Sequence, residues 1–599
     1  MKKGPANKIF RKQNKNPKEQ IKRAGYSDLF VLAIIVLTGV LIYSNSYRCS
    51  FHFDDIPRIV DNPAIRHLAD VKAWWNYYPA RPVGIFTFAL NYHFNQLDVR
   101  YYHLVNLMIH LINASLVWWL TLLIFSTPTL REHPVNSQKK AIAFFTALLF
   151  VSHPLATQSV TYIVQRLTSL AALFYLLSII LYVKARLKGG QSSTNYLLFT
   201  GSLVSALLAI LTKENAFTLP FAILLIEFFF IRTKKISVII QDYRTIILVT
   251  AFLAILLIIP LRYSFSIFKP IPPSNGIFYT ITPYNYLLTQ FSVIVKYIQL
   301  LFLPINQNAD YDFPISNTLF GIRTLLSLLF LLSLIIMGVF FYKRNRIISF
   351  GIFWFFLTLS VESGFIPIHD VIFEHRTYLP SYGFFLVLCT GVYSIPRKKY
   401  KNLSVSILVI LAGIYCILTY ERNTVWKDDI TLWTDSISKS PQKVGPYINR
   451  GVAYGNLGAW DKSMEDYSAA IAIHPNFAKP YANRGINYAR QGQWEKSITE
   501  CSKAIAIDPK YMDAWYNRGV AYSNLRQWDK SIPDYTSAIG IDPKFTSAYY
   551  NRGIDYFHLE QWEKAIADFS KAIEIDPGFT NAYTNRDAAY SKLHSEKSK

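Results

Sequence analysis

Two adjacent acidic residues, Asp54 and Asp55, follow the first long apolar segment of the chain, within the sequence FHFDDIPRIVDNPAIR. A carboxylate in this place can act as a general base that takes a proton from an attacking hydroxyl group. It can also bind a divalent cation, since carboxylate oxygens are preferred ligands of such ions. Adjacent acids in a loop are often only a solvated surface. The pair is therefore a candidate catalytic site or metal site, and either residue could be the base.

A second polar feature is the His153–Pro154 bend between two apolar stretches. Non-helical backbone at membrane depth persists only where it is buried in protein or lines a cavity. His153 is therefore a candidate cavity residue, and a plain turn at the membrane surface is the alternative.

The elements that must position these residues are apolar runs long enough to cross a membrane as helices. All basic clusters between the runs can be placed on the inner side if the segment 284–303, which contains Gln290, Lys296 and Gln299, does not cross. We therefore expect about eleven transmembrane helices, an inner N-terminus and an outer C-terminus. The runs lie near 28–47, 104–126, 141–152, 167–184, 195–211, 216–231, 245–262, 319–342, 347–366, 378–394 and 402–420.

The composition is consistent with a membrane protein. The chain has 62 Lys and Arg against 38 Asp and Glu. Much of this excess flanks the apolar runs, where it indicates topology and not a nucleic-acid partner. The four cysteines, Cys49, Cys389, Cys416 and Cys501, have no metal-binding spacing and predict no disulfide framework.

The C-terminal part repeats every 34 residues. The sequence NRG occurs at 449–451, 483–485, 517–519 and 551–553, and NRD follows at 585–587. This period, with Trp, Gly and Pro at fixed positions, is typical of the tetratricopeptide repeat, a pair of antiparallel helices. Arg450 and its equivalents stand where the usual pattern has Leu.

One asparagine per repeat is a candidate for binding a peptide, because a side-chain amide can donate to and accept from a peptide backbone. The alternative is that these residues only satisfy contacts between helices. They are Asn449, Asn483, Asn517, Asn551 and Asn585.

The repeat phase also extends towards the membrane, because Trp426 and Pro441 lie 34 residues before Trp460 and Pro475. The expected fold is all-α, a polytopic helix bundle followed by an α-solenoid. The expected regions are a basic cytosolic tail (1–27), a transmembrane domain (28–420) with outer loops 48–100 and 263–318, a half-repeat (421–443), the repeat array (444–591) and a disordered tail (592–599).

A family resemblance adds to this interpretation. FDDIPRIVDNPAI is followed in order by RPVGIFTFALNY, YYHLVNLMIHLINA, LTKENAF and EHRTYLPSYGF, and then by the repeats. In this order and architecture the chain resembles the transmembrane and tetratricopeptide-repeat protein family, whose animal members are O-mannosyltransferases of the GT-C class. The resemblance covers residues ~48–384 and the repeats. The late motif departs from the animal pattern by having His375 between the acid and the arginine.

The resemblance implies an inverting membrane glycosyltransferase that uses a polyprenyl-phosphate sugar. Asp54 or Asp55 would take the proton of a Ser or Thr hydroxyl. Developing charge on the leaving phosphate needs fixed cations nearby. The implied donor-phosphate residues are Arg376, His375, Lys213 and Arg81, and the implied residues of a polar cavity are His153, Glu214 and Glu374.

The function expected from the sequence is transfer of a mannose-like hexose to exported polypeptides that the repeats recruit. The partners are thus membrane lipid, a lipid-linked sugar and the polypeptide, with no nucleic acid. A divalent cation at Asp54 and Asp55 is the one candidate cofactor. The expected location is a bacterial inner membrane, with the repeats on the outer side.

Three alternatives stay open at this stage. A non-catalytic scaffold for envelope or secretion proteins would have the same architecture. A flippase for lipid-linked sugars would favour charges deep within the spans, whereas this sequence has most of them at the ends. An oligosaccharide ligase is also compatible, because the motifs do not specify the length of the donor.

Overall fold

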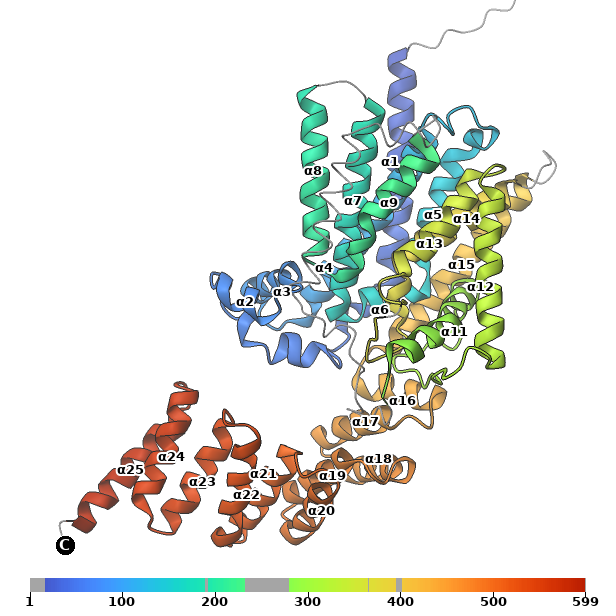
Figure 1. Cartoon of the computed structure of the whole chain (residues 1–599). Coiled ribbons are helices and arrows are strands. Elements are labelled where there is room, and N and C mark those ends of the chain that lie inside the picture. Colours follow the sequence, from blue (N-terminus) through green and yellow to red (C-terminus); the bar gives the residue numbers. More distant parts are fainter. Residues whose placement is uncertain (1–16, 189–191, 232–279, 365, 395–400, 598–599) are drawn as a thin grey trace, which may run out of the picture. The chain divides into compact units, whose positions relative to one another are not determined.

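The computed structural model describes residues 17–188, 192–231, 280–364, 366–394 and 401–597 (Figure 1). The apolar run 245–262 and the first part of the outer segment 263–318 lie outside these residues, as does most of the basic tail. The described residues form helices and loops with no β-strand, which confirms the all-α class. They divide into two compact units.

The first unit, which ends at Asp428, contains the apolar helices. Its α-helices are α1 (Pro17–Ile42), α2 (Val71–Tyr77), α3 (Pro82–Asn95), α4 (Val99–Phe125), α5 (Lys139–Ser152), α6 (Thr157–Val160), α7 (Arg166–Lys188), α8 (Ser193–Ile210), α9 (Leu219–Ile226), α11 (Pro283–Phe302), α12 (Ile322–Phe341), α13 (Arg346–Leu359), α14 (Pro380–Ser394) and α15 (Lys401–Val425). Short 3-10 or π turns connect them: η1 (Ser46–Arg48), η2 (Ile56–Val60), η3 (Pro63–Ile65), η4 (Pro134–Gln138), η5 (Pro154–Ala156), η6 (Ile163–Gln165), η7 (Glu214–Thr218), η8 (Glu227–Ile231) and η11 (Glu374–Thr377).

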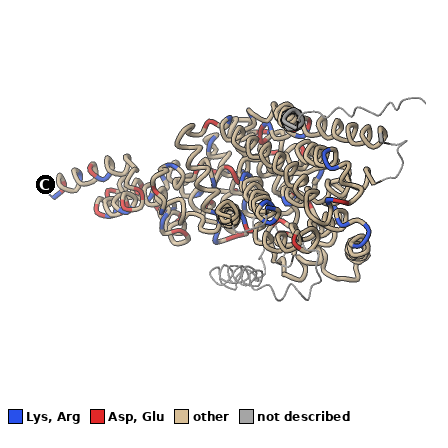
Figure 2. Tube along the Cα trace, turned by 90° about the horizontal axis from the view of Figure 1, so that it is seen from above, with Lys and Arg blue, Asp and Glu red and all other residues tan. Residues whose placement is uncertain are grey.

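Several of these helices have the length and composition of membrane spans. Within the described residues, six helical stretches qualify, and a pair of helices bent by 51° at His153 would make a seventh. Two further apolar helices are shorter, Asp28–Ile42 and Arg346–Leu359. Figure 2 shows long parts of the tube without a charged residue. A polytopic helix bundle is therefore confirmed, whereas the total of eleven crossings stays a prediction. The six stretches are Val99–Phe125, Ile163–Lys188, Ser193–Ile210, Glu214–Ile231, Ile322–Phe341 and Asn402–Val425.

Close packing within the bundle depends on small residues at a helix crossing. A Cβ atom added to Gly383 on α14 would lie 2.5 Å from the carbonyl oxygen of Gly351 on α13, and the reverse distance is 2.6 Å. The two backbones are in direct contact, which is a common way for membrane helices to associate. This crossing places the loop between α13 and α14 at a defined position.

The short helices α2 and α3 lie at one end of the bundle and contact each other, and α3 also contacts α4 and α7 (Figure 1). They belong to the expected outer loop 48–100. A buried apolar cluster that includes Ile59, Ile85, Phe88, Tyr102 and Leu167 attaches this loop to the bundle. The loop is therefore a packed part of the fold, able to hold side chains in fixed positions.

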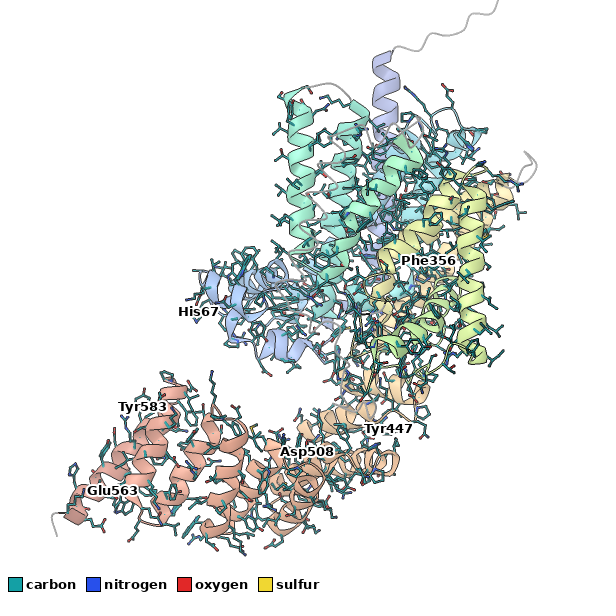
Figure 3. The ribbon with its side chains drawn as sticks, in the orientation of Figure 1. His67, Phe356, Tyr447, Asp508, Glu563 and Tyr583 are labelled. Atoms are coloured by element: carbon teal, nitrogen blue, oxygen red, sulfur yellow. The ribbon has the colours of Figure 1, made fainter. Side chains whose placement is uncertain are left out.

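The second unit is an array of antiparallel helix pairs (Figure 3). Its helices are α16 (Asp429–Lys439), α17 (Val444–Asn456), α18 (Trp460–Ile473), α19 (Ala478–Arg490), α20 (Trp494–Ile507), α21 (Met512–Asn524), α22 (Trp528–Ile541), α23 (Thr546–His558), α24 (Trp562–Ile575) and α25 (Thr580–Lys597). Helix α25 continues through residues 592–597, where we expected a disordered tail, so that expectation is corrected.

The regular spacing of glycine in the array has a steric cause. A Cβ atom on Gly451 would lie 2.6 Å from the ring of Tyr467 on the paired helix. Gly519 and Gly553 stand in the same relation to Tyr535 and Phe569, at 2.9 and 2.8 Å. Only glycine allows the two helices of a repeat to approach this closely.

The arginine that replaces the usual leucine joins neighbouring repeats. Arg518 on α21 forms two hydrogen bonds of 2.8 Å to the carboxylate of Asp534 on α22 and a third of 3.0 Å to Ser502 Oγ on α20. Arg450, Arg484 and Arg552 make the equivalent contacts with an acid 16 residues later and a hydroxyl 16 residues earlier. The departure from the usual pattern therefore creates a ladder of part-buried ion pairs.

We predict that Arg518→Leu destabilises the array by about 3 kcal/mol, because it leaves the buried Asp534 carboxylate without its partner. The double variant Arg518→Leu/Asp534→Leu should recover most of this loss. The measurement is pulse proteolysis in urea on the full-length protein, with cleavage within 444–591 followed by mass spectrometry.

Lys571→Met is the matched control, because the Lys571–Glu574 pair is exposed and such pairs contribute little to stability. If Arg518→Leu were as stable as this control, the ion pairs would not hold the repeats together.

Candidate functional site

The two aspartates have different environments. Asp55 is fully buried, and its carboxylate accepts the backbone N–H of His52 at 3.0 Å and that of Val164 at 2.7 Å. Burial raises the pKa of Asp55 to about 7, although both hydrogen bonds oppose this shift. Because both oxygens bind the chain's own backbone, Asp55 attaches the loop to η6 and is not accessible to a substrate.

Asp54 is the accessible member of the pair. Its side chain is 43% exposed, and its backbone N–H donates to the hydroxyl of Tyr162 at 3.1 Å. Phe53, directly before it, has a φ of 47°, which is uncommon for a residue with a side chain. The backbone turn at 52–55 therefore directs the Asp55 side chain into the protein and leaves the Asp54 side chain accessible to a ligand.

The electrostatic surroundings of Asp54 include both signs of charge. Burial raises the pKa of the Asp54 carboxyl, and the charge of Asp370 adds to this rise, whereas Arg58 and Arg81 lower the pKa. The nearer of the two arginines is Arg58, whose Nε lies 4.0 Å from Asp54 Oδ2. Asp54 is thus a carboxylate with a greater proton affinity than one in free solution, which suits a general base.

Two ion pairs continue this cluster. Arg81, directly before α3, binds both carboxylate oxygens of Glu214, through Nε at 3.0 and 3.1 Å and through a terminal nitrogen at 2.9 Å. Lys213, directly before Glu214 in the chain, lies 2.7 Å from Glu362 and donates to Thr168 Oγ1 at 2.9 Å. The Lys213–Glu362 pair is almost fully buried, and the Arg81–Glu214 pair is partly exposed.

Arg376 is occupied by the chain's own backbone. It is 3% exposed and donates to the carbonyl oxygens of Asp370 and Val371 at 2.6 and 3.1 Å, to that of Glu362 at 3.4 Å and to Tyr286 Oη at 3.2 Å. These contacts hold the loop between α13 and η11. They differ from the anion-binding role that we expected of Arg376.

His375 and Glu374 are also largely structural. His375 bonds to Gln158 Oε1 through its backbone N–H at 2.7 Å and through Nδ1 at 3.2 Å. Burial and the nearby cations Lys213, Arg376 and Arg81 hold its pKa well below the usual range, so the imidazole is neutral and cannot balance a phosphate charge. Glu374 is fully buried and binds Gln307 Nε2 and the backbone N–H of Asn308, each at 2.8 Å.

His153 is a structural residue at the bend. Its Nδ1 accepts the backbone N–H of Leu155 at 3.2 Å, and its Nε2 lies 3.2 Å from the carbonyl oxygen of Leu301. The cavity beside it has a volume of only about 10 Å³, enough for about one water molecule. This cavity is too small for a substrate.

Three of the repeat asparagines donate hydrogen bonds within the array. Asn551 and Asn585 donate to the hydroxyl groups of Tyr516 and Tyr550 in the preceding repeat, both at 3.0 Å. Asn517 donates to the carbonyl of Asp513 on its own helix at 2.6 Å. A bound peptide would have to compete with these contacts. Asn449 and Asn483 are both partly exposed on their helices.

The structure also tests the idea of a metal at the aspartate pair. In the described part of the chain, no three His, Cys, Asp or Glu side chains are grouped so that they could hold a metal ion. Both oxygens of Asp55 bind backbone N–H groups. The pair does not fit a shared cation, and we derive no step through one.

Sequence reasoning missed Glu362 and Asp370, which interact electrostatically with the predicted residues. The signal for Glu362 was its position inside the predicted span 347–366, since an acid within such a segment usually has a partner or a function. Asp370 had no signal, because loop residues meet only after the chain folds.

Comparison with known proteins agrees with the architecture. The tetratricopeptide repeat family matches residues 513–545 and 546–579, and a related TPR repeat family matches 487–525. The protein O-mannosyl-transferase F38B6.6 of Caenorhabditis elegans is 26% identical over 484 residues, which are 76% of this chain and 64% of the relative. The human protein O-mannosyl-transferase TMTC3 is 24% identical over 482 residues, 73% of this chain and 51% of the relative.

The chain is a relative of the transmembrane and tetratricopeptide-repeat proteins. This confirms the resemblance that its motifs indicated. The chain spans about half to two thirds of the length of these two relatives. Among solved structures, a crystal structure of MamA is 24% identical and covers 25% of this chain and 89% of that protein, with a TM-score of 0.23.

We predict that the two aspartates separate stability from activity. Asp55→Asn should destabilise the protein by about 1–3 kcal/mol, because an amide can accept only one of the two backbone N–H groups and sets its own N–H against the other. Asp54→Asn should leave the melting temperature unchanged. The measurement is thermal unfolding of both purified variants in detergent, followed by tryptophan fluorescence. Equal melting temperatures for the two variants would contradict the structural role of Asp55.

Proposed function

We propose that the protein is a membrane glycosyltransferase of the GT-C type. It transfers a mannose-like hexose, with inversion, from a polyprenyl phosphate to Ser or Thr hydroxyl groups of exported polypeptides. The observation that carries this proposal is the accessible Asp54 carboxylate, next to cationic side chains at the end of a bundle of apolar helices. The names of the related proteins, which are O-mannosyl-transferases, support the substrate class.

Asp54 is the general base in this proposal. The acceptor hydroxyl oxygen forms a bond to the anomeric carbon as its proton passes to Asp54. The bond between that carbon and the phosphate oxygen breaks, and its electron pair stays on the polyprenyl phosphate. Asp55, as a buried neighbour, positions Asp54 and takes no part in the proton transfer.

The charge that develops on the leaving phosphate is balanced by the fixed cations of the site. Arg81 and Lys213 supply part of this positive potential, although each is paired with a glutamate. Arg376 contributes indirectly, because it holds the loop that contains Glu362 and Asp370.

The topology follows from the same proposal. The N-terminus lies on the cytosolic side, and the site and the repeats lie on the outer side, where exported polypeptides pass. The tetratricopeptide repeats recruit the acceptor, with the asparagine ladder Asn449, Asn483, Asn517, Asn551 and Asn585 as the contact surface.

The test is intact-mass analysis of exported proteins from cells with the wild type, a deletion, or Asp54→Asn at an equal level of protein. We expect a hexose on some exported proteins to disappear in both the deletion and the Asp54→Asn strain. The matched control is Asp61→Asn, an exposed acid in the same loop, which should retain the modification.

A deletion phenotype that Asp54→Asn rescues, with no change of mass in any exported protein, would disprove the transferase. The protein would then be a scaffold, the alternative that the repeat array on a membrane anchor allows.

A second prediction concerns pH. A general base acts in its ionised form, so kcat/KM rises as the pH passes upwards through the pKa of Asp54. Because that pKa is raised, the acidic limb should lie above the value of about 3.9 for a free aspartate. Asp370→Asn removes a charge that raises the pKa and should move the limb to lower pH. The measurement is the pH profile of hexose transfer in vitro. A limb that stays in place in Asp370→Asn would contradict the assignment of Asp54 as the base.

A further inference from the structure

Two arginine side chains lie against one aromatic ring beside Asp54. The guanidinium carbon of Arg58, in η2, is 5.1 Å from the centre of the Tyr78 ring, and that of Arg81 is 5.2 Å from the same centre. A cation is attracted to the face of such a ring. Tyr78 therefore keeps two like charges close together that would otherwise repel each other.

The side chain of Arg58 has hydrogen-bond donors that a ligand can use. A guanidinium group carries five N–H donors, yet within the described residues the side chain of Arg58 makes no hydrogen bond. Its nearest acid is Asp54, with 4.0 Å between nitrogen and oxygen, and its side chain is 33% exposed. Arg58 is thus a partly accessible cation whose position is set by a ring and a loop and whose donors remain available.

The other cations of the site are committed to the protein itself. The guanidinium of Arg376 binds three backbone carbonyl groups and a tyrosine hydroxyl. The ammonium of Lys213 binds Glu362 and Thr168. Arg81 is intermediate, because Glu214 takes Nε and one terminal nitrogen. In the part of the chain that the structure describes, no hydrogen bond occupies its other terminal nitrogen.

We propose that Arg58 and Arg81, placed by the ring of Tyr78, form a binding site for a phosphate group. The planar guanidinium matches two phosphate oxygens at once. The ligand class, the phosphate of a lipid-linked sugar, rests on the proposed function. The site places the phosphate next to the Asp54 carboxylate, so that the base and the leaving group share the charge of Arg58.

The position of the site gives it one property that a general basic surface would lack. Asp54 lies against the guanidinium that holds the phosphate, so its negative charge opposes phosphate binding. Removal of that charge should strengthen binding, whereas removal of Arg58 should weaken it. The two variants therefore move the affinity in opposite directions.

The experiment measures binding to the full-length protein in detergent, with two probes, a short-chain polyprenyl phosphate and inorganic phosphate. We expect Arg58→Gln to weaken binding of the polyprenyl phosphate about tenfold or more, and Asp54→Asn to strengthen it. Arg58→Lys keeps the charge but loses the planar group, and should lie between Arg58→Gln and the wild type. The matched control is Arg323→Gln, because Arg323 also lies over a ring, 4.5 Å from the centre of Phe313, but outside the site.

Each outcome decides between interpretations. Wild-type affinity in Arg58→Gln, or in Arg58→Lys if the glutamine variant does not fold, would overturn the phosphate site. An equal loss in Arg323→Gln would also overturn it, because the effect would then be one of general charge. If inorganic phosphate displaces the polyprenyl phosphate completely and binds as tightly, the site takes free phosphate. If it does not, the site takes the lipid.

Binding and transfer can fail separately. Arg58-dependent phosphate binding without any hexose transfer would leave this site standing and disprove the transferase. If the wild type transfers hexose but Arg58→Gln binds phosphate as tightly as the wild type, the transferase stands and the phosphate site is disproved.

Discussion

The buried carboxylate of Asp55 holds together the part of the structure on which the site depends. It binds the backbone N–H groups of two segments, that of His52, three residues before it, and that of Val164 in η6, 109 residues after it. A carboxylate out of water is stable only when its oxygens are satisfied, and here backbone N–H groups satisfy them. Because Asp55 is fixed inwards, its neighbour Asp54 is held at the surface of the site. Tyr162, directly before η6, supports the same turn.

The site is built from loops that meet at the ends of rigid helices. Arg81 precedes α3, Lys213 and Glu214 precede α9, and Glu362 follows α13. Each loop is held by an ion pair to another loop, so that charges of both signs alternate across the site. Buried ion pairs contribute little net stability but are costly to break on one side only. Their effect here is to specify one arrangement of the loops.

Ion pairs also fix the arrangement of the repeat array, where they lie between helices and not between loops. Its arginines replace an apolar residue with a part-buried pair in each repeat, and a third contact reaches the hydroxyl of the preceding repeat. Stability in repeat proteins comes from contacts within a repeat and between neighbours. The arginine ladder contributes to both. It gives the array a regular polar seam, whereas the glycines provide close contact between the paired helices.

The sequence by itself determined the all-α class, the apolar helices and the 34-residue repeats, because each depends on local periodicity. It also indicated the aspartate pair and most of the cluster around it, since charges at the ends of apolar segments are rarely incidental. Only the tertiary structure decided which member of a pair is available. Asp54 differs from Asp55, and Arg58 differs from Arg376, through contacts with segments far away in the chain. Residue type predicts what a side chain can bind, whereas folding decides whether the protein itself already occupies it.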